Sequence, residues 1–419
     1  MKKNEVSVAN SHPRLSEEIR LEGHIIDSLI LPRVMDIIMD AGGNFDVLEV
    51  DIGTHKHAVS LARMKVFADA QEQMDHIITA LQELGAQLVN GDDVHVAPAP
   101  TDGALPDTFY STTNLPTEVR LSGRWQPVAG TEMDLVVVID PDQGRARNVP
   151  IAEIKKGDLV VVGHSGIRVQ PPQREREQEV FSFMRNEVSS ERPNKLAIAQ
   201  IARTMRQVRE AGQRICFVIG PAIIHSGAGP YMERLIRNGY VQVLFGGNAI
   251  AVHDVESQLF GTSLGINLTN GLPTPGGHSH HMRAINAMRR IGSIKRAVEI
   301  GFLRSGLMAE AYRSGIEVVL AGSVRDDGPM PDVVGDMAEA QRQMRAALQG
   351  VEMCIMLATM LHSIATGNLL ASHVKVVAVD INPATVTKLA DRGSFQAVGI
   401  VTDAELFLRE LVEELDLAE

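Results

Sequence analysis

The stretch PTPGGHSHHMRAIN, residues 273–286, places three histidines, an arginine and an asparagine behind a turn rich in proline and glycine. Histidine exchanges protons near neutral pH, so the segment is a candidate for acid–base chemistry. Neighbouring side chains point in different directions on a strand or a helix, so these histidines do not readily share one metal ion. No second cluster of Cys, His and carboxylate has ligand spacing, so we expect no zinc site. The segment is instead predicted to form one wall of a substrate pocket.

Periodicity separates the roles of these histidines. A helix that begins near Ser279 would place His281 on the apolar face with Ile285 and Met288. His278 would then remain in the turn, where it is free to meet a ligand. We therefore predict that His278 faces the pocket and that His281 packs in the core.

A second candidate for proton transfer is the pair His253–Asp254 in AIAVHDVE, which follows a GGN turn and opens a predicted helix. A His–Asp pair can carry acid–base chemistry, and it can equally satisfy the end of a helix. Sequence does not rank this pair against His278.

Glycine-bearing turns follow several predicted strands, in GPAIIHSGAG (220–229), GGNAIAVHD (246–254) and GSVRDDGPMPD (322–332). Glycine lets backbone N–H groups approach a phosphate, and a helix N-terminus favours negative charge. Three such turns in one sheet predict a nucleotide site. The candidate cofactor-binding residues in these turns are Gly220, Gly246, Gly247, Asn248, Ala249, Ser323 and Asp326.

Three polar residues at these strand ends, Asn248, Asp326 and Asp327, can each be interpreted in two ways. Asn248 could cap a helix or bond an amide ligand, and the pair Asp326–Asp327 could contact a ligand or form a solvated turn. No G-x-G-x-x-G follows a strand, so the ordinary Rossmann fingerprint is absent.

The run from VEMCIMLAT through a short helix to VKVVAVD predicts a βαβ unit ending in Asp380. A carboxylate there can bind ribose hydroxyls, but Asp380 could also cap the helix beginning near Pro383. Asn382, two residues on, is a further cofactor candidate.

The elements that must position these residues form an α/β fold. Continuous apolar strands alternate with amphipathic helices over residues 180–419, which predicts a doubly wound, mostly parallel sheet of Rossmann-like type with helices on both faces. Ligands bind beyond the carboxyl ends of such strands, which is where the candidates lie.

Two smaller modules are expected ahead of this sheet. Residues 1–97 show a βαββαβ order typical of a ferredoxin-like module, with its last strand over residues 86–99. Residues 98–172 contain short β-prone pieces separated by turns, which predicts a small antiparallel β-rich module. The catalytic, cofactor-binding domain then spans residues 173–419.

Composition narrows the functional class. A chain of 419 residues exceeds one ordinary core, and a net charge of −12 argues against nucleic acid as the main ligand. The two cysteines, Cys216 and Cys354, lie in apolar runs, so a disulfide framework is excluded and a reducing compartment is expected. No apolar segment follows Lys2 and Lys3, and no apolar run is long enough to span a membrane. We expect a cytoplasmic protein.

The order of these motifs resembles the archaeal-type, NAD-dependent ornithine cyclodeaminases, a family named for the LOR/SDH conserved region that includes the C-terminal domain of cyanobacterial bifunctional arginine dihydrolases. The resemblance rests on LEGHIIDSLILPRVMDII, VIGPAIIHSGAGPYMERLIRNGYV, LFGGNAIAVHDVE, GGHSHHMRAIN, GSVRDDGPMPDV and DINPATVTKLADRGS. The C-terminal region also looks like the NAD-binding fold of deoxyhypusine synthase. The single tryptophan, Trp125, lies in the β-rich region, however, and no Trp–Gly–Lys segment occurs near the C-terminus. Transfer to a protein lysine is therefore not expected.

The resemblance implies conversion of L-ornithine to L-proline and ammonia with NAD as a recycling cofactor. Hydride would leave the α-carbon, the δ-amine would attack that carbon, ammonia would depart and the hydride would return. On this hypothesis Arg283 would bind the substrate carboxylate, while Asp326 or Asp327 would bind a ribose or the substrate amine. His278, or His253 with Asp254, would move the proton.

Two other functions remain open. An NAD-dependent dehydrogenase of another basic amino acid, of the saccharopine type, would release NADH in proportion to product. An NAD- and amino-acid-binding regulator would bind without turnover. In each case we expect a small-molecule ligand, neither nucleic acid nor membrane as a partner, and a homo-oligomer.

Overall fold

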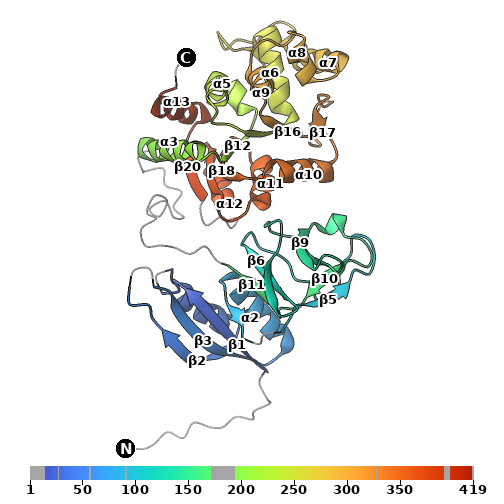
Figure 1. Ribbon diagram of the computed structural model, residues 1–419. Helices are drawn as coiled ribbons and strands as arrows, with labels where there is room; N and C mark the ends of the chain where they lie inside the picture. Colours follow the sequence, from blue (N-terminus) through green and yellow to red (C-terminus); the bar gives the residue numbers. More distant parts are fainter. Residues whose placement is uncertain are drawn as a thin grey trace, which may run out of the picture. The chain divides into compact units, whose positions relative to one another are not determined.

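The computed structural model describes residues 15–26, 28–55, 58–89, 92–170, 194–326, 328–390 and 397–417. The chain divides into two compact units, residues 1–179 and 180–419. Figure 1 labels their helices and strands.

The first unit opens with a four-stranded antiparallel sheet in the order β2-β3-β1-β4. Its elements are β1 (Leu15–Gly23), α1 (Ile30–Asp40), β2 (Asn44–Asp51), β3 (Ser60–Ala68), α2 (Gln71–Glu83) and β4 (Gln87–Leu88). This order and pairing are those of the ferredoxin-like βαββαβ motif, which confirms the prediction.

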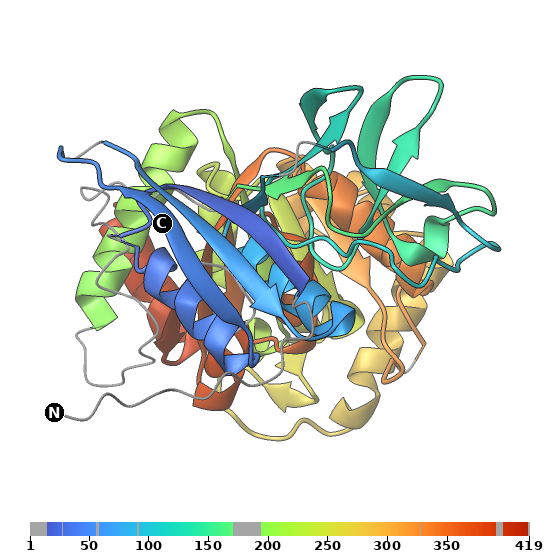
Figure 2. The same ribbon diagram turned by 90° about the horizontal axis from the view of Figure 1, so that it is seen from below.

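Helices α1 and α2 cover one face of this sheet (Figures 1 and 2). Alternate residues of β3 are buried, and Met64 packs in one cluster with Val34 and Ile38 of α1 and Ile77 of α2. The alternate buried residues of β3 and the buried face of α1 therefore pack together in a single apolar core.

The strand expected over residues 86–99 is two strands, so that prediction was wrong. β4 ends at Leu88, and β5 (His95–Pro98) pairs with β10 of a different sheet. Aspartate is depleted in strands, and Asp92 and Asp93 lie between the two pieces.

The rest of the first unit is an antiparallel β-rich module, as predicted. Its further elements are β6 (Thr117–Leu121), β7 (Arg124–Pro127), β8 (Val136–Asp140), β9 (Arg145–Val149), η1 (Ile151–Glu153), β10 (Leu159–Val162) and β11 (Ile167–Val169). They form the sheets β5-β10-β8-β9 and β11-β6-β7 around a core that includes Val119, Val137 and Val161.

The second unit contains a seven-stranded sheet in the order β17-β16-β13-β12-β18-β19-β20, with every neighbouring pair parallel. The strands are β12 (Arg214–Ile219), β13 (Val243–Gly247), β16 (Glu317–Ala321), β17 (Val333–Val334), β18 (Val351–Leu357), β19 (Lys375–Asp380) and β20 (Ala397–Val401). The predicted doubly wound sheet is confirmed, although the two-residue edge strand β17 was not anticipated. The strand order reverses between β12 and β18, which makes this the switch point of the sheet.

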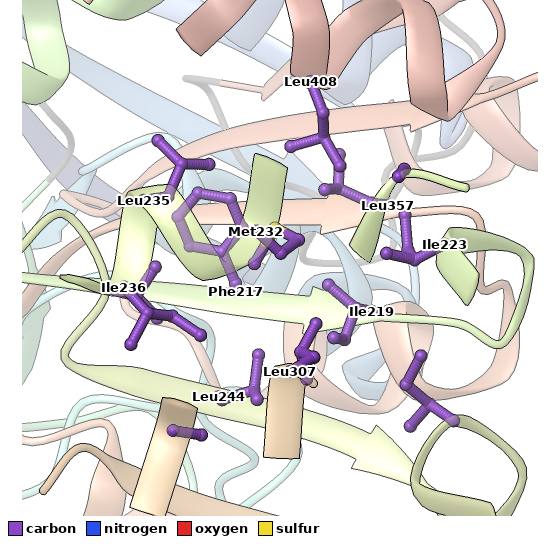
Figure 3. Packing of buried hydrophobic residues seen from close by; sticks show 14 of the residues in the cluster. Phe217, Ile219, Ile223, Met232, Leu235, Ile236, Leu244, Leu307, Leu357 and Leu408 are labelled. Atoms are coloured by element: carbon purple, nitrogen blue, oxygen red, sulfur yellow. The ribbon is translucent and has the colours of Figure 1, made fainter. Parts of the chain in front are cut away.

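Helices cover both faces of this sheet. Phe217 and Ile219 of β12 pack with Met232 of α5 and Leu408 of α13 on one face (Figure 3). Cys216, on the opposite face, packs with residues of α10, α11 and α12. The helices named here are α3 (Asn194–Glu210), α5 (Gly229–Arg237) and α13 (Ala404–Glu414) on the first face, and α10 (Met337–Ala347), α11 (Leu361–Leu369) and α12 (Pro383–Ala390) on the second. Burial on both faces explains why these strands have continuous apolar sequences.

Cys216 and Cys354 are register partners on β12 and β18 and are fully buried free thiols. Within the described residues, no helix is long and apolar enough to cross a membrane.

Candidate functional site

At the switch point, the first residue after β12 is a glycine. Gly220 follows β12 and donates its N–H to the carbonyl oxygen of Leu357 at 3.0 Å. A Cβ added to Gly220 would lie 2.0 Å from the carbonyl oxygen of Ala358, so no larger residue fits without moving the backbone. Gly220 therefore lets the backbone after β12 pass close to the backbone after β18. Ligands bind at this point in sheets of this type.

The predicted glycine turn after β13 is packed against protein. An added Cβ would lie 2.6 Å from Cγ2 of Ile250 at Gly246, and 2.8 Å from Cε1 of His362 at Gly247. Both positions therefore require glycine for packing as well as for any approach of a ligand. Ala249, in the first turn of helix α6 (Asn248–Phe260), is half-buried.

Asn248 has a role that neither of its two interpretations included. Its side-chain oxygen accepts a hydrogen bond from the N–H of Met330 at 2.9 Å, and the residue is only 5% exposed. The N-cap position of α6 is taken by Gly247. Asn248 therefore ties the start of α6 to the loop after β16.

In that loop, Ser323 and Asp326 bond each other. The Asp326 carboxylate accepts from the Ser323 N–H at 2.9 Å and from its hydroxyl at 3.2 Å. This turn brings the two predicted residues together. Asp327, the other predicted acid, lies outside the described residues.

At the end of β19, the side chains of Asp380 and Asn382 each accept a hydrogen bond from the backbone of the following turn. Asp380 Oδ1 accepts from the N–H of Asn382 at 2.8 Å, and Asn382 Oδ1 accepts from the N–H of Ala384 at 3.0 Å. Asn382 is therefore the residue that caps α12. The second oxygen of Asp380 has no hydrogen bond to any described residue, so it is available to a ligand.

Two polar residues in the first turn of α11 were not singled out from the sequence. His362 Nε2 lies 3.2 Å from the carbonyl oxygen of Ala321, at the end of β16. Ser363 is 1% exposed, and its hydroxyl has no hydrogen-bond partner among the described residues. Buried hydroxyls are normally paired, so this hydroxyl, which follows β18 at the switch point, is a candidate contact for a polar ligand atom.

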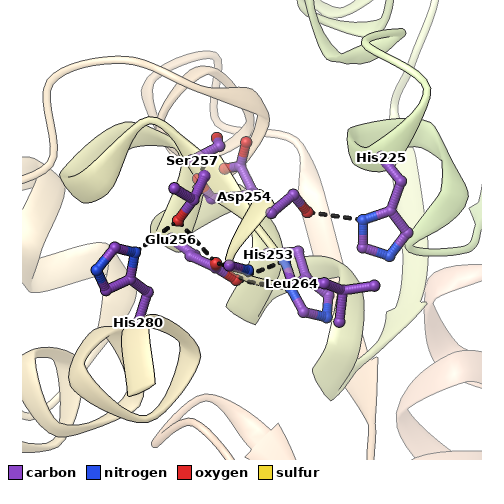
Figure 4. Close-up of polar contacts among 10 residues, drawn as sticks. His225, His253, Asp254, Glu256, Ser257, Leu264 and His280 are labelled. Atoms are coloured by element: carbon purple, nitrogen blue, oxygen red, sulfur yellow. Dashed lines mark hydrogen bonds and ion pairs between the residues drawn. The ribbon is translucent and has the colours of Figure 1, made fainter. Parts of the chain in front are cut away.

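A buried polar network surrounds Glu256 of α6 (Figure 4). Glu256 is 0% exposed, and its Oε2 lies 2.9 Å from Nδ1 of His253. It also accepts from the Thr262 hydroxyl at 2.9 Å and from the Gly265 N–H at 2.9 Å. Burial alone would raise the pKa of Glu256, but these hydrogen bonds outweigh it and hold the pKa below its ordinary value. The residue is therefore an ionised carboxylate inside the protein.

The carboxylate that pairs with His253 is Glu256, not the adjacent Asp254. Residues three apart share one face of a helix, whereas adjacent residues point in different directions. Asp254 instead accepts from the N–H groups of Leu307 at 3.0 Å and Met308 at 2.8 Å, at the start of α9 (Leu307–Arg313). Burial raises the pKa of Asp254 to about 7.

His225, at the end of α4 (Ala222–His225), was missed by sequence reasoning although its turn was recognised. Its ring lies 4.7 Å from that of His253 in an edge-on arrangement, and its Nδ1 is 2.6 Å from the Ser263 hydroxyl. Burial lowers the pKa of His225, and nearby His253 lowers it further, so His225 favours the neutral form. Two imidazoles therefore lie side by side next to a buried carboxylate.

The opening segment docks against this network. It contains η3 (Gly277–Ser279) and most of α7 (His280–Ile291). The neighbouring elements are β14 (Thr262–Ser263) and β15 (Ile266–Asn267) before it and α8 (Ile294–Glu299) after it. Gly265 and Gly277 pack so tightly that a Cβ added to either would come within 2.6 Å of the other's backbone.

The inward-facing histidine of the segment is His280. Its Nδ1 is 2.8 Å from the Thr262 hydroxyl, and its ring stacks on Phe260 at 4.6 Å. The buried residues of α7 are Ala284, Ile285 and Met288, and both His280 and His281 are half-buried, so the core role expected for His281 was wrong. His280 lies four residues before the buried Ala284, and it faces inward because Thr262 and Phe260 of the preceding segment pack against this side of the first turn.

His278 and Arg283 remain on the exposed side of this wall. The Arg283 Nε donates to the Ser279 hydroxyl at 3.1 Å, which leaves its terminal amino groups free of partners among the described residues. In the described part of the chain, no group of three or more His, Cys, Asp and Glu side chains has an arrangement that could hold a metal ion.

Family models match three consecutive parts of the chain. Residues 16–115 match the LOR/SDH bifunctional enzyme conserved region, residues 116–198 the first region of the arginine dihydrolase ArgZ-like C-terminal part, and residues 199–411 its Rossmann fold. The ornithine cyclodeaminase of Methanocaldococcus jannaschii is 53% identical over 408 residues, which cover 96% of both chains. This chain belongs to the ornithine cyclodeaminase family. The predicted family and the predicted enzyme class are thereby confirmed.

Two bifunctional cyanobacterial proteins contain a region similar to this ornithine cyclodeaminase family member. AgrE of Nostoc sp., a bifunctional arginine dihydrolase/ornithine cyclodeaminase, is 46% identical over 96% of this chain and 58% of its own. A crystal structure of AgrE as a ternary complex with ornithine and NAD⁺ matches 96% of this chain and 58% of that chain, with a TM-score of 0.53 and 44% identity. The apo structure of ArgZ, an arginine dihydrolase from the ornithine–ammonia cycle in cyanobacteria, matches 97% of this chain and 59% of that chain, with a TM-score of 0.84 and 40% identity.

Proposed function

We propose that this chain converts L-ornithine to L-proline and ammonia, with NAD as a cofactor that is regenerated in each turnover. The observation that carries the proposal is the AgrE complex with ornithine and NAD⁺, which is 44% identical over 96% of this chain. Relatives of full length in archaea are named for the same activity.

The edge of the sheet around the switch point suits a dinucleotide. Ser363 and Asp380 follow the neighbouring strands β18 and β19, and the Ser363 hydroxyl and one Asp380 oxygen have no hydrogen-bond partner in the described part of the chain. Asp380 would bind ribose hydroxyls, while Ser363 and the turns at Gly220, Gly247 and Asn248 would form the rest of the cradle. When bound, NAD supplies the hydride acceptor and returns the hydride later in the cycle.

His253 is proposed as the group that takes the proton from the substrate ammonium. Glu256 holds Nδ1 of His253, which leaves Nε2 as the nitrogen that accepts and returns a proton. The buried carboxylate also stabilises the imidazolium that forms. The ring of His225 contacts that of His253. A second imidazole, at the exposed end of α4, therefore lies next to the His253–Glu256 pair.

The wall formed by α7 is proposed to hold the substrate. The terminal amino groups of Arg283, which no described residue binds, suit a carboxylate, and acids of the loop after β16 would attract the distal ammonium. His278 remains the alternative proton carrier, since it is exposed beside the same wall.

The test is to incubate the purified chain with L-ornithine and a catalytic amount of NAD⁺, and to measure proline and ammonia together. Equal amounts of both products, well above the NAD⁺ supplied, are expected. Product limited to the amount of NAD⁺, with NADH appearing, would instead establish a dehydrogenase. Binding of ornithine without any product would favour a regulator.

Two further properties are proposed for the whole chain. The two free, buried thiols suit a reducing cytoplasm. The apolar residues exposed on strand β2, among them Val47, Leu48 and Val50, suit burial between copies of the chain in a homo-oligomer.

A further inference from the structure

Thr262 links the buried carboxylate of Glu256 to a third histidine, His280 (Figure 4). Its hydroxyl oxygen lies 2.9 Å from Oε1 of Glu256 and 2.8 Å from Nδ1 of His280, and the residue is 0% exposed. Glu256 belongs to α6, and His280 is the first residue of α7, the helix that we propose forms the substrate wall. A single buried hydroxyl therefore connects the helix that carries His253 to this wall.

The charge of Glu256 determines the direction of these two hydrogen bonds. An ionised carboxylate has no proton to donate, so the hydroxyl proton of Thr262 must point toward Oε1 of Glu256. A hydroxyl has a single proton, so the contact with His280 must be donated by the Nδ1–H of the imidazole. The opposite direction would leave two oxygen lone pairs facing each other at 2.9 Å between buried residues. Neutral His280 is therefore the Nδ1–H tautomer, in which Nε2 carries no proton.

The ring of His280 is also held by Phe260, the last residue of α6. The two rings stack with their centroids 4.6 Å apart and their planes 20° apart. A rotation of the imidazole would break both this stacking and the hydrogen bond to Thr262. The direction of the Nδ1–H bond is therefore fixed by contacts on two sides of the ring.

The other end of this hydrogen-bonded chain is His253. Oε2 of Glu256 lies 2.9 Å from Nδ1 of His253, whereas Oε1 accepts from Thr262. The N–H groups of Leu264 and Gly265 also donate to this carboxylate, at 3.2 Å and 2.9 Å. With Oε1 held by Thr262, the carboxylate cannot rotate without drawing Oε2 away from His253. Hydrogen bonds in series also polarise one another, so a change at one end of the chain affects the other.

We propose that His280 is a positioning residue of the proton-transfer site. Its Nδ1–H orients the Thr262 hydroxyl, and this hydroxyl holds the Glu256 carboxylate against His253. This role rests on the proposed reaction, in which His253 moves the proton, and it gives α7 a part in proton transfer as well as in holding the substrate. Loss of the imidazole should lower turnover more than it weakens substrate binding.

Three substitutions of His280 separate the donor from the ring. His280→Phe keeps a ring that stacks on Phe260 but removes the donor, His280→Asn places an amide N–H near the position of Nδ1, and His280→Gln places one near the position of Nε2. For His280→Phe and His280→Gln, kcat with ornithine should fall about tenfold while KM changes by less than about threefold. His280→Asn should recover kcat to within about threefold of the wild type. Equal losses in all three variants, or losses confined to KM, would overturn the proposal.

A double substitution shows whether His280 acts through Glu256. In a chain that carries Glu256→Gln, the change His280→Phe should cause no further fall in kcat, because the carboxylate on which it acts is already absent. Losses that multiply in the double variant, with folding verified by circular dichroism, would show that His280 acts independently and would overturn the proposal.

Nitrogen NMR of the isotope-labelled chain tests the direction of the hydrogen bond without substrate. The ring signals that disappear in His280→Phe belong to His280, and in alkaline solution they should show the proton on Nδ1. A proton on Nε2 alone would overturn the proposal. The ring signals of His253 should move in His280→Phe and stay in place in His280→Asn. These signals do not depend on turnover, so failure of the proposed reaction, seen as absence of proline with the wild-type chain, is recorded separately.

Discussion

At the scale of single residues, the sequence identified His253 but not its partner. Asp254 is adjacent in sequence, yet the carboxylate on the same helix face is Glu256, three residues on. The signal was present, because His253 and Glu256 have i,i+3 spacing on a predicted helix. What the sequence does not contain is the closure of the Thr262–Gly265 turn over Glu256, which buries that carboxylate.

Glu256→Gln tests whether the carboxylate positions His253 for proton transfer. An amide stabilises imidazolium poorly, so kcat/KM should fall by about 100-fold, and its pH profile should change because the variant lacks the ionised carboxylate. The measurement is kcat/KM for ornithine as a function of pH. Thr262→Ser, which keeps the hydroxyl that bonds Glu256, is the matched control and should retain the profile. A Gln variant with a normal pH profile and only a lower melting temperature would assign Glu256 a structural role.

At the scale of elements, strands and helices with strong periodicity were predicted well, and short pieces were not. Strands that are buried on both faces can be recognised in the sequence as continuous apolar runs, as in RICFVIG and VEMCIMLAT. The two-residue strands β4, β14, β15 and β17 have too few residues for any periodic signal and exist because a neighbouring strand pairs with them.

Asp254 of α6 connects this helix to the start of α9. Its carboxylate caps α9 through Leu307 and Met308, next to Gly306 at φ 98°. Asp254→Ala should therefore lower the free energy of unfolding by roughly 2–4 kcal/mol, through lost capping and two unpaired buried N–H groups. Chemical denaturation measures this loss. A large fall in kcat with unchanged stability would return Asp254 to the list of catalytic candidates.

The pH dependence of stability gives a second readout of Asp254. Burial raises its pKa from 3.8 to about 7, so the folded state keeps a proton that the unfolded state has lost. The stability contributed by this group is full below pH 3.8 and is lost as pH rises toward 7. Asp254→Asn cannot titrate, so its stability should lack this decline.

At the scale of the whole molecule, β2 is an edge strand of its sheet and is exposed along most of its length. Leu48→Lys should therefore shift the protein toward smaller species at micromolar concentration, because a charge opposes burial of this surface. Light scattering after size-exclusion chromatography measures the shift. Met39→Lys, an equivalent change at an exposed position of α1, is the control and should have no effect. A wild-type chain that is already monomeric would contradict the proposed homo-oligomer.

The sequence by itself determined the order of the longer elements, the parallel sheet and the strand ends at which we propose that the cofactor binds, because burial on two faces and helical periodicity are local patterns along the chain. Its motifs also determined the family. Only the tertiary structure decided which carboxylate pairs with His253, that His280 and not His281 contacts Thr262 of the Glu256 network, and that the hydroxyl of Ser363 has no partner among the described residues. These outcomes depend on contacts between segments far apart in the chain, and a hydrogen bond is settled by the position of both of its partners.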